Sequence, residues 1–500
     1  EAADMGTTVM KWPAVYRALL LLTMACVIAL VDLFVTDDQR RLTFWLTQAT
    51  LVAFALMHFV MFDGERSVYA MQGLMVSDSL GHLLACFAAI ACAVTVAYAR
   101  PYIGARDMLK GEFFTLTLFV LLGVSVMVSA NNFLVVYLGL EVMSLSLYAL
   151  TALRRDHAVA TEAAMKYFVL GALASGFLLY GLSMMYGATG SLDHQRVFEV
   201  IGKGQVNQSV LTFGLVFIVA GLAFKFGAAP FHMWLPDTYH GAPTPITLFI
   251  GSAPKPAMVT AIGSPLVEGM LGLAPDWQQM ISVLAVLSLL VGNLAAIAQT
   301  NLKRMLAYSA IAQIGFMLLA LTAGVVSGNT LSAGNAYSSA LFYMVVYVLT
   351  TLGSFGLILL LARRGFECEE IADLAGLNAR SPWMAGAMAV FMFSLAGIPP
   401  TAGFYAKLSV LQALITTNLP HHLWLAVFAV LISLVAAYYY LRIVKVMYFD
   451  APAPDSAAPS ERPGVHALLA VNGGAVLLLG ILPGGLMGLC SAAILRALAS

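Results

Sequence analysis

AFKFGAAPFHMWLPD, at residues 223–237, is an apolar stretch that Gly, Pro and a lysine interrupt near its middle. A second stretch, SLAGIPPTAGFYAK at residues 394–407, has a similar plan, with a Pro pair followed by a lysine about two helical turns later. Gly and Pro disfavour a continuous helix, because Gly is too flexible and Pro lacks the backbone N–H donor. Paired interrupted segments are typical of membrane transporters, whose binding or conduction site lies at the breaks. The sequence therefore predicts a membrane protein with two interrupted spans.

The composition of the whole chain agrees with a membrane location. Of its 500 residues, 61% are hydrophobic and 10% are charged, whereas a soluble domain has roughly 25% charged residues. Apolar stretches of about 18 residues or more recur along the chain, and each is long enough to cross roughly 30 Å of hydrocarbon as a helix. We predict an all-α polytopic membrane protein with about fourteen transmembrane helices, at residues 14–35, 41–62, 79–99, 113–130, 132–152, 162–187, 209–229, 244–271, 278–299, 302–324, 335–362, 382–418, 421–449 and 465–490.

The domain organisation follows from the two interruptions, which fall in spans seven and twelve. The five spans that end with span eight and the five that end with span thirteen cover similar lengths, so we predict two inverted five-helix repeats with discontinuous helices 7 and 12. The predicted parts are an N-terminal three-helix segment (1–112), a first antiporter-like repeat (113–271), a second repeat (272–449), and a Pro-rich loop with a C-terminal helix (450–500). We interpret the charged connection at residues 367–383 as a solvated loop, with contact to a partner as the alternative.

The Lys and Arg residues are distributed unevenly over the connections between the predicted spans. Of the 25, five lie inside apolar segments, 15 lie in connections on the even-numbered side and five lie on the odd-numbered side. Cytoplasmic loops of membrane proteins carry an excess of Lys and Arg. The asymmetry predicts a multi-pass protein of a bacterial inner membrane with both termini in the periplasm.

Three ionisable residues lie deep inside predicted spans, where a charge is costly and function is the default interpretation. Glu141 lies about ten residues into span five, near the bilayer midplane. A structural carboxylate that caps a neighbouring helix is the alternative for this residue. Lys225 precedes the first break, where freed carbonyls and water can stabilise its charge, and Lys407 follows the second break. These three residues are the strongest candidates for a functional site.

Three further residues are weaker candidates. Lys255 lies about a dozen residues into span eight, and the prolines on either side of it predict a distorted helix. Lys166 stands only a turn inside span six, where a lysine can also extend to the membrane surface. His232 lies just past the first break and is a candidate relay residue, although a lone membrane histidine is more often a hydrogen-bonding partner.

Buried lysines near a carboxylate suit proton transfer, because burial lowers the pKa of an amine and a nearby carboxylate raises it again. Movement of the carboxylate would therefore load or unload the proton. One acid and four lysines in spans five, six, seven, eight and twelve predict a hydrated polar line across the membrane core. A sodium site would need several oxygen ligands with few positive charges nearby, so a lysine-rich core disfavours it.

No redox centre, metal site or dinucleotide site is expected in this chain. Its five cysteines are scattered without a CxxC pair, whereas an iron–sulfur cluster needs grouped thiolates. No Gly-rich turn follows a predicted strand, as a dinucleotide site requires. We interpret the cysteines as small, buried hydrophobic residues.

Several of these motifs together resemble the antiporter-like membrane subunits of respiratory complex I, the NADH:quinone oxidoreductase. The resemblance covers nearly the whole chain and rests on LGLEVMSLSLYAL around Glu141, EAAMKYFVLGALASG around Lys166, FKFGAAPFHMWLPDTYHGAPTP with Lys225, SAPKPA with Lys255, NLKRMLAYSAIAQIGF, and SLAGIPPTAGFYAK with Lys407. Within the family, Lys407 in place of a glutamate argues against the M subunit. The lack of a long C-terminal lateral helix argues against the L subunit, so the N-type subunits are the most similar.

The resemblance implies roles for these residues. Glu141 and Lys166 would form a coupled pair that tunes the central Lys225, which would pass its proton through Lys255 to Lys407 and out. Pro256 stands where the family pattern has a small residue, which leaves the local geometry around Lys255 open. The implied function is proton translocation driven by quinone reduction elsewhere in the complex.

The resemblance also implies partners and cofactors. The partners would be M-, K- and J-like neighbouring membrane subunits, the lateral helix of an L-like subunit, and lipids, with no nucleic acid. NAD, FMN, iron–sulfur clusters and quinone would lie in partner subunits. Two alternatives remain: a subunit of a multi-subunit sodium/proton antiporter without electron transfer, and a quinone-binding subunit or passive scaffold.

Overall fold

The structure, a computed structural model, describes residues 12–62, 67–204, 206–452 and 463–499. Its helices, with η1 a π-helix and η2 and η3 of the 3-10 type, are α1 (Trp12–Asp32), α2 (Arg41–Met61), α3 (Ser79–Ala105), α4 (Gly111–Val128), α5 (Phe133–Thr151), α6 (Ala158–Thr189), α7 (His194–Gly202), α8 (Gln208–Phe226), α9 (Trp234–Gly241), α10 (Thr244–Gly251), α11 (Pro254–Gly263), η1 (Ser264–Gly269), η2 (Leu271–Leu273), α12 (Ala274–Ile297), α13 (Leu302–Thr322), α14 (Ala333–Leu361), η3 (Ile371–Leu374), α15 (Leu377–Arg380), α16 (Pro382–Ala396), α17 (Ala402–Ile415), α18 (Pro420–Phe449), α19 (Pro463–Ile481) and α20 (Gly484–Ala499). One short antiparallel hairpin, β1 (Val68–Ala70) with β2 (Met75–Ser77), joins α2 to α3. The predicted all-helical membrane fold is confirmed.

The predicted spans correspond to single helices in most cases. Within the described residues, 12 helices are long and apolar enough to cross a membrane. The predicted spans eight and twelve are instead built from shorter pieces, α10 with α11 and α16 with α17. The breaks predicted in spans seven and twelve are present, because α8 ends before the turn to α9 and α16 ends before the turn to α17. The division into two inverted repeats stays a prediction.

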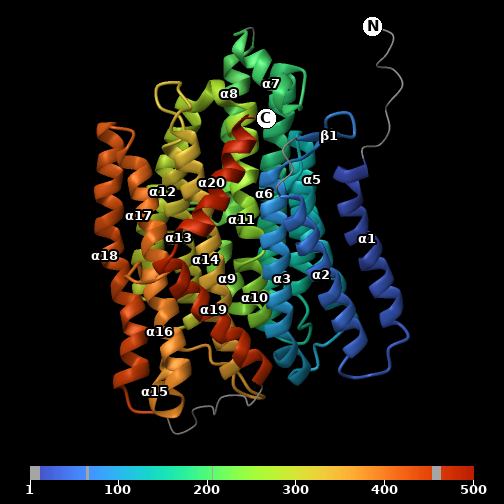
Figure 1. Ribbon diagram of the computed structural model, residues 1–500, viewed down its shortest axis with the longest axis vertical. Coiled ribbons are helices and arrows are strands. Elements are labelled where there is room, and N and C mark those ends of the chain that lie inside the picture. The colour runs from blue at the N-terminus through green and yellow to red at the C-terminus, as the bar shows by residue number, and fades with distance from the viewer. Residues whose placement is uncertain (1–11, 63–66, 205, 453–462, 500) are drawn as a thin grey trace.

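The single C-terminal span predicted at residues 465–490 is wrong. The chain there forms two helices, α19 and α20, that meet at Pro483. A proline donates no backbone hydrogen bond and disfavours a helical residue before it, so α19 ends just before this position. In Figure 1 the two red helices cross the face of the bundle over α14, which both of them contact.

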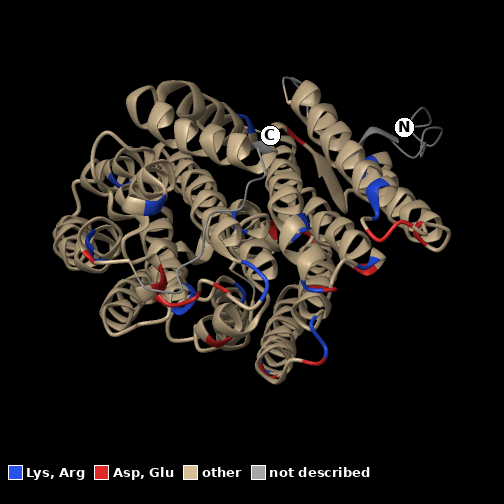
Figure 2. Cartoon of the chain, turned by 90° about the horizontal axis from the view of Figure 1, so that it is seen from below, with Lys and Arg blue, Asp and Glu red and all other residues tan. Residues whose placement is uncertain are grey.

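The bundle has two ends that carry different elements (Figure 1). The α7 end also carries the β1–β2 hairpin, the start of α1 and the end of α20, whereas the opposite α15 end carries α10 and the turn from α1 to α2. Figure 2 looks onto the α15 end and shows charged residues gathered in its loops, with few on the outer faces of the helices. Apolar outer faces are expected of helices that lie against lipid.

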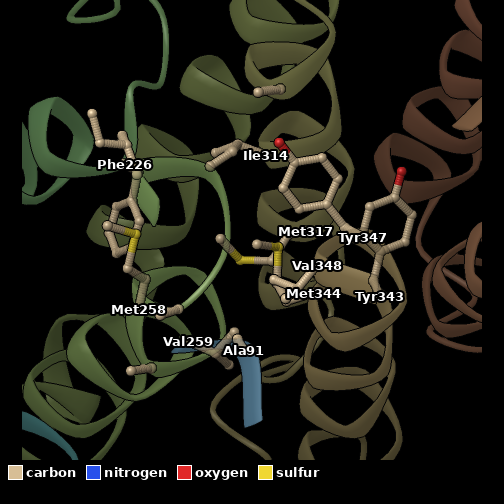
Figure 3. Close-up of a cluster of buried hydrophobic side chains, with 14 of the residues drawn as sticks. Ala91, Phe226, Met258, Val259, Ile314, Met317, Tyr343, Met344, Tyr347 and Val348 are labelled. Carbon is tan, nitrogen blue, oxygen red and sulfur yellow. The ribbon is translucent and has the colours of Figure 1, made fainter. Parts of the chain in front are cut away.

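The centre of the bundle is formed by α13 and α14, whose residues are nearly all buried. Figure 3 shows Phe226 and Met258 of the α8–α11 region facing Ile314, Met317 and Met344 of these two central helices. All five of these side chains are 4% exposed or less. An apolar layer of buried side chains therefore lies between the α8–α11 region and the central helices.

The interpretation of the connection before α16 as a solvated loop is wrong, because it packs against the ends of α3 and α13. Glu367 accepts hydrogen bonds from Arg106 (2.9 Å) and Tyr102 (2.5 Å). Glu369 pairs with the buried Lys303 at 2.9 Å. Burial alone would raise the pKa of Glu367, but the hydrogen bonds from Arg106 and Tyr102 hold it below its usual range. The loop between α18 and α19, predicted to be Pro-rich, lies largely outside the described residues, because these omit 453–462.

The cysteines follow their predicted burial with one exception. Cys86, Cys92, Cys368 and Cys490 are buried, whereas Cys26 is exposed on α1. Burial raises the pKa of the Cys368 thiol, which lies in the packed connection before α16. A buried thiol of raised pKa is a poor nucleophile, so Cys368 acts as a packing residue.

Candidate functional site

Helix α5 carries Glu141 into the middle of the bundle. Asn132 precedes the helix, and its side chain caps it by accepting a hydrogen bond from the backbone of Leu134 at 2.9 Å. Gly139 lies so close to α4 that an added Cβ would stand 2.6 Å from the backbone nitrogen of Met127. This close approach of two helix backbones fixes α5 along its length and so fixes the position of Glu141.

Glu141 and Lys225 form a direct ion pair at the centre of a polar cluster. The Lys225 Nζ lies 3.1 Å from the Glu141 Oε1, and Lys225 is 6% exposed. The amine also donates to the hydroxyls of Ser175 (2.9 Å), Ser144 (3.2 Å) and Tyr148 (3.4 Å). Ser175 in turn donates to Glu141 at 2.5 Å, so it bridges the two charged groups. The cluster offers a proton several hydrogen-bonded positions within one small volume.

The break after Lys225 keeps its backbone groups hydrogen-bonded, as a break inside a membrane must. Gly227 ends α8 with a φ of 78°, a left-handed conformation that glycine adopts without strain. The Trp234 indole donates to the carbonyl of Phe224 at 2.8 Å, and the backbone nitrogen of Ala229 donates to the Ser288 hydroxyl at 2.9 Å. The sequence signal for a break therefore corresponds to a defined turn.

Lys255 is fully buried and donates to the last carbonyl of the interrupted helix. Its Nζ lies 3.1 Å from the carbonyl oxygen of Phe226, the final residue of α8. The carbonyls at a helix C-terminus lack intrahelical partners and carry partial negative charge, which favours a cation there. A cavity of about 10 Å³ between Lys225 and Lys255 has room for about one water. The distortion predicted for span eight is present, because α10 ends at Gly251 and α11 begins at Pro254.

Lys407 has the same kind of partner at the second break. Its Nζ donates at 3.0 Å to the carbonyl of Ala396, the final residue of α16, which Gly397 ends with a φ of 83°. The amine also lies 4.9 Å from the centre of the Phe316 ring, a favourable arrangement for a cation. Among the described residues, no carboxylate lies within 4.0 Å of Lys255 or Lys407.

A neutral hydrogen-bond network that sequence reasoning missed holds the end of α16. Gln313 donates to the carbonyl of Leu395 (3.2 Å) and to the Tyr440 hydroxyl (2.9 Å), and it accepts from Tyr343. The hydroxyls of Ser309 and Tyr440 lie 2.5 Å apart. Because Leu395 precedes the residue that accepts from Lys407, this network positions the carbonyl end beside the lysine. The polar Gln313 inside predicted span ten was the available sequence signal.

Lys166 makes no ion pair with Glu141 in the structure, and the coupling of these two residues that the resemblance implies stays a prediction. The Lys166 side chain is 44% exposed and pairs with Glu162 (2.8 Å) on its own helix and Asp237 (2.9 Å) on α9. Arg304 at the start of α13 also binds Asp237, at 2.6 Å. These four residues form a surface cluster, and the residue that pairs with Glu141 is Lys225.

His232 lies in the turn between α8 and α9 and is partly buried. Its Nδ1 has no hydrogen-bond partner among the described residues, and no hydrogen bond joins its ring to the buried lysines of that region. The structure therefore brings Glu141 and Lys225 into contact and Lys255 to the same cavity, but it leaves His232 apart. A relay role for His232 stays a prediction.

The serines around Lys225 were also missed from the sequence. Ser144 lies three residues after Glu141, which places both side chains on one face of α5, so spacing could have identified it. Ser175 lies on α6, and its approach to Glu141 depends on how two helices are rotated against each other. Nothing in the sequence alone specifies that rotation.

Comparisons with known proteins agree with this geometry. The family described as NADH:quinone oxidoreductase/Mrp antiporter, TM, matches residues 130–433. A Polaromonas naphthalenivorans protein named NADH-quinone oxidoreductase subunit N is 60% identical over 487 residues, which cover 97% of each chain. A chain in the structure of respiratory complex I from Thermus thermophilus is 30% identical, with a TM-score of 0.78, over 95% of this chain and 99% of that one. A chain of the Mrp complex from Dietzia sp. DQ12-45-1b shares the fold, with a TM-score of 0.82 at 20% identity over 97% of each chain.

The helical bundle, its two breaks and its buried lysines thus define an antiporter-like membrane subunit. The similar proteins identify the particular family within this class of membrane subunits. The chain belongs to the family of NADH-quinone oxidoreductase N subunits.

Proposed function

We propose that this chain moves protons along a line formed by Glu141, Lys225, Lys255 and Lys407. It does so as a proton-translocating membrane subunit of NADH:quinone oxidoreductase. The observation that carries the proposal is the 3.1 Å ion pair of Lys225 with Glu141 beside a cavity shared with Lys255. A carboxylate that approaches or leaves this amine changes its affinity for a proton, which is the step that a pump needs.

The contacts support an order of transfer. Lys225 would pass a proton across the shared cavity to Lys255, with Ser175 keeping Glu141 and Lys225 in register. Transfer onward to Lys407 would have to cross the apolar layer around Met258 and Met317 (Figure 3), so that step requires a change in packing or hydration. The resting geometry therefore supports a short route from Lys225 to Lys255 and a gated one beyond it.

The surface cluster of Lys166, Glu162, Asp237 and Arg304 would form the entrance to this line. Tyr167, next to Lys166, stacks on Trp234 at 4.5 Å, and its edge meets Tyr148, which accepts from Lys225. These contacts give a packed connection between the surface cluster and the buried ion pair. In this arrangement Lys166 receives protons from water and does not tune Lys225 directly.

The distribution of charged residues supports an orientation of the chain in the membrane. The family resemblance supports a set of partner subunits. The excess of Lys and Arg in the loops at the α15 end supports a cytoplasmic location for that end, with both termini in the periplasm of a bacterial inner membrane. M-, K- and J-like subunits and the lateral helix of an L-like subunit would bind the lipid-facing helices. NAD, FMN, iron–sulfur clusters and quinone would be bound by other subunits of the complex.

The test is Lys225→Ala in the assembled complex, with NADH-driven proton pumping measured in membrane vesicles. We expect pumping to be lost while the complex still assembles. Lys445→Ala is the matched control, because Lys445 is a surface lysine that pairs with Asp450 far from the cluster. Normal pumping by an assembled Lys225→Ala complex would refute the proposal. A sodium/proton antiporter subunit would instead purify without flavin or iron–sulfur subunits.

A further inference from the structure

A second cavity lies on the outward side of the buried lysines, at the α7 end of the bundle. Its volume is about 50 Å³, and its lining includes Val259, Thr260, Ser264, Glu268 and Tyr337. These residues come from α11, from the π-helix η1 that continues it, and from α14.

Two side chains on the cavity wall have hydroxyls without a hydrogen-bond partner. Thr260 and Tyr337 are 9% and 6% exposed, and neither hydroxyl is bonded to any described residue. A buried hydroxyl without a partner is costly, so such groups are normally bonded to protein or to water. A cavity of this volume has room for more than one water. These two hydroxyls therefore offer hydrogen bonds to water within a lining that is otherwise mostly apolar.

The cavity continues to the surface through three hydrogen-bonding groups. The Ser264 hydroxyl donates to Glu268 at 2.8 Å and lies 3.2 Å from the Nδ1 of His194. The same nitrogen lies 3.4 Å from the Glu268 carboxylate. His194 is 1% exposed, whereas the Glu268 side chain is 49% exposed. Glu268 thus contacts a buried group on one side and the surroundings of the protein on the other.

One residue of the cavity lining, Val259, belongs to the same helix as Lys255. Val259 lies one helical turn after Lys255 on the same face of α11, and it also lines the cavity. Figure 3 places Val259 at the edge of the apolar layer with Met258. The small apolar side chain of Val259 therefore lies between the helical turn that carries Lys255 and this water-sized space. A narrow apolar constriction of this kind conducts only when it becomes hydrated.

We propose that this cavity is the outward limb of the proton route, which carries protons from Lys255 to release at Glu268. In this route a proton leaves the Lys255 ammonium for water held by Thr260 and Tyr337. It then reaches the Glu268 carboxylate, which passes it to water outside, and Ser264 with His194 positions that carboxylate. The amine is left neutral and ready to accept from Lys225. The inference rests on the proposed function, and it gives this chain an exit that does not use Lys407.

The first experiment removes the two unpartnered hydroxyls with the double variant Thr260→Val and Tyr337→Phe. We expect the rate of NADH-driven proton pumping by the assembled complex to fall by about fivefold or more, the change expected when buried hydrogen-bonding groups are removed. The control, Thr115→Val with Tyr438→Phe, makes the same atomic changes elsewhere and should pump normally. Unchanged pumping in the cavity variant would overturn the proposal.

Two further measurements decide the question if the double variant fails to assemble. Glu268→Gln should slow pumping to a similar degree, whereas Glu199→Gln, on an exposed glutamate at the same end, should not. Ser264→Cys should react with a small, membrane-impermeant cationic thiol reagent from the periplasmic side only, and the reaction should slow pumping. Wild-type protein treated with the reagent should keep its rate. Lack of reaction, or reaction from the cytoplasmic side alone, would contradict an outward limb.

The results also separate this proposal from the proposed function. Loss of pumping in Lys225→Ala, with normal pumping in every cavity variant, would refute the outward limb and leave the proposed function in place. Normal pumping in Lys225→Ala as well would refute the proposed function, because the outward limb depends on proton transfer along the buried lysines.

Discussion

The interrupted segments α8–α9 and α16–α17 share a backbone plan but surround their lysines differently. Lys225 lies on the helix before its break, and a carboxylate from α5 approaches it to 3.1 Å. Lys407 lies on the helix after its break and donates to the carbonyl of Ala396. A neutral network around Gln313 occupies the second region, where the first has an ion pair with three hydroxyls. One segment thus has a charged partner for its lysine and the other has a dipole.

This difference indicates which lysine can be switched by a side chain. The Glu141 carboxylate can rotate away from Lys225, because only its own side-chain torsions must change. The carbonyl that accepts from Lys407 belongs to the backbone of α16 and cannot leave without disrupting the end of that helix. We infer that side-chain movement controls the first lysine, whereas hydration and helix packing control the second.

The largest expected contrast is the effect of Lys225→Met and Lys407→Met on stability. Lys225→Met leaves Glu141, whose side chain is 19% exposed, without its charged partner, and breaking a buried ion pair costs up to about 3–5 kcal/mol. Lys407→Met removes a buried charge whose hydrogen-bonded partner is a carbonyl, so stability should stay level or rise. The measurement is the fraction of complex that remains intact on a native gel after heating. Equal losses in the two variants would show that Lys407 also has a charged partner.

Much of the fold and part of the site could be predicted from the sequence. Apolar length identified the spans, and the Gly and Pro residues identified both breaks, because these signals act within one segment. The partner of Lys225 could not be predicted, since it depends on how α5, α6 and α8 are rotated against one another. Lys166, which the resemblance couples to Glu141, forms its ion pairs with Glu162 and Asp237, and the coupling stays a prediction.

The remaining errors have local physical causes. Pro483 indicates the division between α19 and α20, but the apolar residues on both sides of it favour a single continuous span. The charges of the connection before α16, taken from the sequence alone, favour a solvated loop. Those charges are paired, as Glu369 with Lys303 and Glu367 with Arg106 illustrate. A charged loop can therefore pack against a bundle when its charges have partners there.

A smaller effect is expected from Ser175→Ala, which tests whether the bridging hydroxyl matters to the ion pair. The change removes the donor to Glu141 and an acceptor from Lys225, and a buried group left without its partner costs about 1–3 kcal/mol. We expect pumping to slow several-fold in an assembled complex. Ser409→Ala is the matched control, because this buried serine of α17 donates only to a carbonyl of its own helix. Equal slowing in both variants would show that the hydroxyl beside the ion pair matters no more to pumping than a serine of the second interrupted segment.

The smallest effect is expected from Lys166→Ala. Lys166 is partly exposed, and its pairs with Glu162 and Asp237 are screened by water, so the stability of the complex should not change measurably. Pumping should fall less than in Glu141→Gln, because other surface groups can still supply protons to the line. Both variants should be measured in parallel in the same vesicles. If Lys166→Ala slowed pumping as much as Glu141→Gln, Lys166 would have to approach Glu141 in another state of the protein. The first segment would then contain two switchable lysines, and its contrast with the lone Lys407 would become larger.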